Sequence, residues 1–255
     1  MQDNSALGRA LAVVRDLRAR CPWDRVQTRA TLRPYLVEEV LELDQALGGG
    51  DPDEIRDELG DFLLHLAWQL VIAEERGEFT PDQVADGLER KMRRRHPHLY
   101  DLGPRESWET LKRRERPRGT LDGLPPTLPP LLMAYRLQER AAGVGFDWPD
   151  AAGPLAKVRE ELDEVERELA SPPSPRRDER LAREIGDLLF SVVNLARKLG
   201  VAPTVALDGA NRKFRARFAE IERLAAERGI EVASAGLEVL DRLWDEAKLA
   251  EPADG

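Results

Sequence analysis

The chain has 255 residues, of which 42% are hydrophobic, 34% charged and 5% aromatic. That length gives one large domain or two ordinary ones, each able to bury a core. The formal net charge of −9 argues against nucleic acid as a direct partner, because such a partner requires a basic surface.

The first half of the sequence predicts a series of amphipathic helices, because apolar residues recur at spacings of three and four. Asp51-Pro52 and Thr80-Pro81 mark the beginnings of two helices, and the run Gly48-Gly49-Gly50 marks the end of another. Proline at 34 is expected in the first turn of its helix. The helices are expected at about 5–20, 31–47, 52–76, 81–95 and 108–116.

A segment rich in proline, glycine and threonine follows at 117–130 and reads as a linker. Beyond it, helices are expected at 131–142, 155–170, 176–199, 202–228 and 236–250. No stretch alternates convincingly with period two, so the prediction is all-α. It comprises two tandem helical-bundle domains, 1–116 and 131–255.

The single cysteine, Cys21, excludes a disulfide framework and a thiolate metal site. Residues 1–20 lack the apolar core of a signal peptide. The longest mostly apolar run, 62–73, is shorter than the roughly 20 residues that span a bilayer. We therefore expect a cytoplasmic protein without a membrane segment.

Two acidic helices in the second half carry the candidate chemistry. The apolar stripe on the first of them is expected to face the core, with the carboxylates of Glu161 and Glu164 on its flank and Glu160 pointing nearly opposite. Glu184 and Asp187 occupy one flank of the next helix. Close like charges raise a pKa or bind a cation, and hard oxygen donors suit Mg²⁺ or Mn²⁺. The stripe consists of Val158, Leu162, Val165 and Leu169.

The same polar positions recur in the first half, which a merely solvated helix face would not require. Glu38, Glu39 and Glu42 correspond to the first acidic motif, and Glu58 and Asp61 to the second. Three further matches pair Lys213 and Arg217 with Lys91 and Arg95, Trp244 and Lys248 with Trp108 and Lys112, and Phe146-Asp147 with Trp23-Asp24.

The pattern Glu-Glu-x-x-Glu, followed after a loop by Glu-x-x-Asp, resembles the MazG family of nucleoside triphosphate pyrophosphohydrolases. It occurs here twice, at 38–42 with 58–61 and at 160–164 with 184–187. Further stretches are similar to the two-domain members: 21–24, 94–98, 144–148 and 186–190. The resemblance covers residues 7–248, which is nearly the whole chain.

The resemblance implies a homodimer of tandem helical bundles that uses Mg²⁺ to cleave nucleoside triphosphates into monophosphate and pyrophosphate. The resemblance also implies a role in removing unwanted nucleotides from the pool or in adjusting nucleotide levels during starvation. Metal binding is assigned by flank geometry to Glu161, Glu164, Glu184 and Asp187, with Glu39, Glu42, Glu58 and Asp61 as the second candidate site. Glu160 and Glu161 are the catalytic candidates. Substrate binding is assigned to Asn194, Lys213, Arg217, Trp244 and Lys248.

The second half is the expected catalytic site, because Trp68 stands where the second half has Asn194. An indole accepts no hydrogen bond and ligates no metal, and its bulk would crowd a pocket. The first half keeps its carboxylates, so metal or nucleotide binding there stays open.

Two alternatives belong to other classes of protein. A nucleotide sensor without turnover would tolerate the loss of acidic positions, yet the second half retains all of them. A carboxylate-bridged metal oxidase needs Glu-x-x-His, and none of the three histidines has a glutamate three residues before it. Base preference and metal number are left open.

Overall fold

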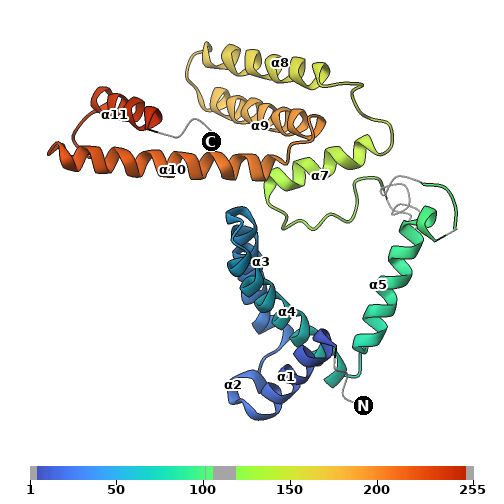
Figure 1. The fold of residues 1–255 in the computed structure, drawn as a ribbon. Coiled ribbons are helices and arrows are strands. Elements are labelled where there is room, and N and C mark those ends of the chain that lie inside the picture. The colour runs from blue at the N-terminus through green and yellow to red at the C-terminus, as the bar shows by residue number, and fades with distance from the viewer. Residues whose placement is uncertain (1–4, 101, 106–118, 251–255) are drawn as a thin grey trace. The chain divides into compact units, whose positions relative to one another are not determined.

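The computed structural model describes residues 5–100, 102–105 and 119–250. Every regular element in those ranges is a helix, which confirms the all-α prediction (Figure 1). The chain forms two compact units, Met1–Arg105 and Glu106–Gly255. The domain limits at 116 and 131 stay predictions, and the helix predicted at 108–116 lies outside the described residues.

In the first unit, α3 and α1 both pack against α4, and α1 also contacts α2. Its core joins Leu11 and Val14 of α1, Leu32 of α3 and the second half of α4. The helices of this unit are α1 (Ala6–Arg20), α2 (Pro22–Arg25), α3 (Arg29–Gly49), α4 (Pro52–Glu75), α5 (Pro81–Arg95) and the 3₁₀ helix η1 (Pro97–Leu99).

Side-chain caps set where the helices of the first unit begin, because each accepts a hydrogen bond from an otherwise unpaired backbone N–H. Asp51 caps α4 and Thr80 caps α5, as the sequence predicted. Thr28 caps α3, so that helix begins at Arg29 and Pro34 lies beyond its first turn. Gly50 ends α3 with a φ of 78°, a conformation that favours glycine.

In the second unit, α8 packs along α9, α7 contacts α9 and α10, and α11 packs on α10 (Figure 1). Ile221 and Ala225 of α10 form a small core with Leu243 of α11. The helices are α7 (Pro130–Ala142), α8 (Ala152–Leu169), α9 (Pro175–Lys198), α10 (Pro203–Glu227) and α11 (Leu237–Leu249).

The stripe expected to face the core on α8 does not do so along its whole length. Val165 is buried, but Leu162 and Leu169 are exposed, and the buried neighbour of Leu162 is the carboxylate Glu161. The reason is that α8 meets α9 through its acidic flank. The same holds for α3, where Val40 and Leu47 are exposed.

No single helix in the described ranges is long and apolar enough to cross a membrane. Helices α9 and α10 meet at a bend of 106°. They reach the length and apolar composition of a membrane span only when the two helices are taken together.

Candidate functional site

The α8–α9 pair brings together carboxylates that lie in separate motifs of the sequence. Glu161 comes from α8, and Glu184 and Asp187 come from α9. One carboxylate oxygen of each lies within 4.8 Å of the others. Glu164, one turn after Glu161, is close enough to interact with Glu184. All four residues predicted as metal ligands therefore meet at this pair of helices.

The second-unit cluster carries unbalanced negative charge. The pKa of Glu184 is raised, first because burial disfavours its charged form and then because Glu164, Asp187 and Glu161 repel it. A divalent cation would relieve both effects, since it stabilises the ionised form of every carboxylate around it.

Lys157 holds the two glutamates that begin the motif of α8. Its Nζ lies 2.7 Å from an oxygen of Glu161 and 2.9 Å from an oxygen of Glu160. The hydrogen bonds that Lys157 donates to Glu161 and Glu160 raise the pKa of the ammonium group. The side chain of Glu161 is 6% exposed and that of Glu160 is 57% exposed, so only Glu161 turns toward the cluster.

The first unit contains a matching cluster. Glu39 of α3 and Glu58 and Asp61 of α4 bring carboxylate oxygens within 4.8 Å of one another. Burial raises the pKa of Glu39, and repulsion from Asp61 and Glu42 raises it further. Burial and then repulsion from Glu42 also raise the pKa of Glu58, and its Oε2 is buried without a hydrogen-bond partner among the described residues.

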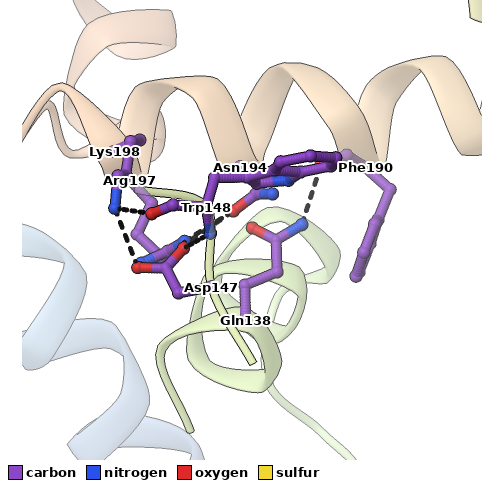
Figure 2. Close-up of polar contacts among 7 residues, drawn as sticks. All are labelled: Gln138, Asp147, Trp148, Phe190, Asn194, Arg197 and Lys198. Carbon is purple, nitrogen blue, oxygen red and sulfur yellow. Dashed lines mark hydrogen bonds and ion pairs between the residues drawn. The ribbon is translucent and has the colours of Figure 1, made fainter. Parts of the chain in front are cut away.

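A pocket of about 610 Å³ opens beside α9 in the second unit. Asn194 lines it, and Arg197 donates hydrogen bonds of 2.9 and 3.0 Å to the Asn194 Oδ1 (Figure 2). Asp147 accepts a hydrogen bond of 2.5 Å from Arg197 and one of 3.1 Å from Lys198. The remaining wall is mostly apolar: Leu121, Leu137, Gln138, Ala141, Gly145, Phe146, Trp148 and Phe190.

Sequence reasoning missed Arg197 and treated Asp147 only as part of a repeat and of the family-like stretch 144–148. Their pairing joins the loop after α7 to the end of α9, which lie 50 residues apart in sequence. The available signal was the spacing of Arg197, which lies one turn after Asn194 and can reach back to it.

Replacing Asp147 with asparagine removes its ion pair with Arg197 and should destabilise the second unit at pH 7. The loss should be only about 1 kcal/mol, because solvent screens this partly exposed pair. The hydrogen bond from Arg197 is the main reason that the pKa of Asp147 lies below the usual value of 3.8. A carboxyl group with a lowered pKa stabilises the folded protein at pH values above its usual pKa. That stabilisation is lost as the pH falls through the lowered pKa of the folded state. In urea unfolding, the difference in unfolding free energy between the unmodified chain and Asp147→Asn should therefore be smaller near pH 3 than at pH 7.

Asp163→Asn is the matched control for this measurement, because Asp163 is exposed on α8 and no ion pair holds its side chain in the described residues. Its unfolding free energy should match that of the unmodified chain at both pH values. An equal loss in both variants would show that the Arg197 pairing contributes nothing specific.

In the first unit, the position matching Asn194 belongs to the core. Trp68 is 6% exposed and packs in the core cluster with Ala67 and Val71. Its ring lies 6.0 Å from the ring of Trp23 and 5.0 Å from that of His65. Side chains of the core thus occupy the place where the second unit has a pocket wall.

The remaining predicted substrate-binding residues lie on α10 and α11. The guanidinium of Arg217 lies over the ring of Trp244, 5.3 Å from its centroid, and Lys248 forms an ion pair of 2.6 Å with Asp245. Lys213 is exposed on α10. These side chains thus belong to the α10–α11 pair, whereas the acidic cluster belongs to α8 and α9.

Comparison with known proteins gives matches over most of the chain. Residues 27–100 match the family model described as the MazG nucleotide pyrophosphohydrolase domain. The chain is 39% identical over 249 residues to the nucleoside triphosphate pyrophosphohydrolase of Escherichia coli K12, covering 93% of this chain and 94% of that protein. It is 42% identical over 234 residues to the Thermotoga maritima nucleoside triphosphate pyrophosphohydrolase/pyrophosphatase MazG, covering 89% of each chain. A Bacillus subtilis protein, YabN, is 41% identical over 252 residues, covering 94% of this chain and 51% of its own length.

Proposed function

Because the chain belongs to the MazG family, we propose that it hydrolyses nucleoside triphosphates between the α and β phosphates. One water is consumed, the bridging P–O bond breaks, and a nucleoside monophosphate and pyrophosphate are released. This proposal rests mainly on helix α9, which contributes both to the acidic cluster and to the wall of the pocket. The cytoplasm, which holds nucleoside triphosphates, is the expected compartment.

The order of residues along α9 supports this assignment. Glu184, Asp187 and Asn194 lie on one side of the helix, because a step of seven residues returns to within about 20° of the same direction and a step of three to within about 60°. Asn194 lies about 10 Å along the axis from Asp187 at 1.5 Å per residue. A nucleotide with its phosphates at the carboxylates can therefore place its nucleoside at the pocket.

The donor set fits a divalent metal ion. Glu161, Glu164, Glu184 and Asp187 offer only hard carboxylate oxygens, and burial, followed by repulsion from the other three, raises the pKa of Glu184. These residues would hold Mg²⁺, with Mn²⁺ as the alternative. Bound there, the metal would supply the positive charge that an acidic site needs to accept a triphosphate and to shield the departing pyrophosphate.

Glu161 is the first candidate for orienting the attacking water and accepting its proton. Its carboxylate is buried, faces the cluster and is held by Lys157 at 2.7 Å. Glu160 is the second candidate, but its side chain is 57% exposed in the single chain. Glu160 therefore enters a site only where a second chain packs against that exposed side chain.

The cationic side chains of α10 and α11 are assigned to the phosphates. Lys213, Arg217 and Lys248 carry the charge that neutralises phosphate oxygens. Trp244 holds the guanidinium of Arg217 over its ring at 5.3 Å, which limits its freedom before substrate binds. Asn194 would offer its amide to the nucleoside.

A homodimer is supported by the exposed apolar flanks of both acidic helix pairs. Leu162 and Leu169 of α8 and Ile185 and Val192 of α9 remain exposed in the single chain. Large exposed apolar surfaces usually mark an interface. Sedimentation equilibrium should give twice the chain mass of 28.7 kDa, and a monomer at micromolar concentration would contradict the assignment.

The proposal is tested by separating the products formed from each common NTP and dNTP with Mg²⁺ and with a chelator. Monophosphate and pyrophosphate should form only with the metal. Formation of diphosphate and orthophosphate would overturn α–β cleavage. Metal-dependent nucleotide binding without products would favour the sensor instead.

A further inference from the structure

His65 is a buried side chain beside the first-unit cluster, on α4 one turn after Asp61. Its Nε2 lies 3.7 Å from an oxygen of Glu39, which is longer than a hydrogen bond. Its Nδ1 is buried and has no hydrogen-bond partner in the described part of the chain. The imidazole is thus 3% exposed and makes no hydrogen bond there, although one nitrogen faces a carboxylate cluster.

Such a side chain needs an explanation, because buried polar groups are almost always hydrogen-bonded. Glu58 adds a second unpaired atom to the same cluster, since its Oε2 is buried and has no hydrogen-bond partner in the ranges that the structure describes. Burial disfavours a charged imidazole, and a neutral ring can donate a nitrogen lone pair. Trp68 holds the ring through an edge-to-face contact, with 5.0 Å between the ring centroids.

We infer that the first unit contains a transition-metal site in which His65 adds a nitrogen ligand to Glu39, Glu58 and Asp61. Imidazole nitrogen is a common ligand of transition-metal ions, whereas Mg²⁺ prefers oxygen alone. A metal between Glu39 and His65 would satisfy Nε2 and draw the orphan oxygen of Glu58 into coordination.

The second unit shows why this site would be distinct. In the repeat, Ser191 stands where the first unit has His65. Ser191 is also buried, so that position can offer only an oxygen. The two clusters share their carboxylates but differ in one donor atom, and the difference predicts different metal preferences. The inference does not depend on turnover at either unit.

The test is pulsed EPR of Mn²⁺ bound to the full chain, prepared without a histidine tag. A directly bound imidazole gives a ¹⁴N modulation in the electron spin echo, which carboxylates and water do not give. The sequence has three histidines, so the double variant His96→Gln with His98→Gln leaves His65 as the one imidazole. That variant should keep the ¹⁴N modulation at saturating Mn²⁺.

His65→Ser reproduces the second-unit residue and should abolish the modulation. It should also weaken Mn²⁺ binding at this site by about tenfold or more, the size of loss typical for support around a bound metal. A ¹⁴N signal that persists in His65→Ser would overturn the assignment. Its absence from the His96→Gln, His98→Gln chain would overturn it as well, whether or not His65→Ser folds.

Discussion

Replacing Glu161 with glutamine is expected to lower kcat/KM for triphosphate hydrolysis by on the order of 10²–10³-fold, the size of loss seen when an active site loses one charge-stabilising group. Glutamine keeps the shape of the side chain but removes the charge that faces Glu184 and Asp187 within 4.8 Å. Steady-state kinetics at saturating Mg²⁺ measures the effect. Lys157 retains its contact with Glu160 at 2.9 Å, so the helix should stay folded.

Glu39→Gln is the matched control, because Glu39 holds the equivalent place in the first-unit cluster. Its kcat/KM should stay within about threefold of the unmodified chain, which corresponds to less than about 1 kcal/mol. Equal losses in both variants would contradict the assignment of the reaction to the second unit. A loss confined to Glu39→Gln would reverse it.

Replacing Trp68 with alanine is expected to destabilise the first unit by about 3–5 kcal/mol, the usual cost of deleting a buried aromatic ring. Trp68 is 6% exposed and packs against Trp23 and His65. Its Nε1 has no hydrogen-bond partner in the described residues, so the loss is one of packing. Hydrogen exchange of the α4 amides reports the stability of this unit separately from the other.

Asn194→Ala is the control for Trp68→Ala at the equivalent position of the second unit. It removes the acceptor of two hydrogen bonds from Arg197 and should cost about 1 kcal/mol, with α4 exchange unchanged. If Trp68→Ala cost no more than this, Trp68 would not be a core residue, and the contrast between core and pocket would fail.

The sequence predicted the helices well because their ends are coded locally. Asp51 and Thr80 accept hydrogen bonds from the first turns that follow them. Helical periodicity also located the longer helices of the described residues, but it missed α2 and η1, which are too short to show a period. Periodicity did not predict which flank of α8 is buried. Leu162 and Glu161 are neighbours in sequence, and the spacing of apolar residues alone does not determine which of the two faces α9.

The candidate site was only partly predictable. The carboxylates could be assigned because they repeat at helical spacing, and Glu161, Glu184 and Asp187 do meet. The Asp147–Arg197 contact depends on how a loop approaches the end of α9, which no local pattern encodes. His65 was judged only against Glu-x-x-His. Its position facing Glu39 depends on the packing of α3 on α4.

The second-unit carboxylates are assigned to α–β cleavage. The most direct test is ³¹P NMR of the products that a chain carrying Glu39→Gln and Asp61→Asn forms from one triphosphate with Mg²⁺. Only the second cluster is intact in that chain, and nucleoside monophosphate with pyrophosphate should accumulate at near the unmodified rate. Diphosphate with orthophosphate, or no product, would contradict this assignment.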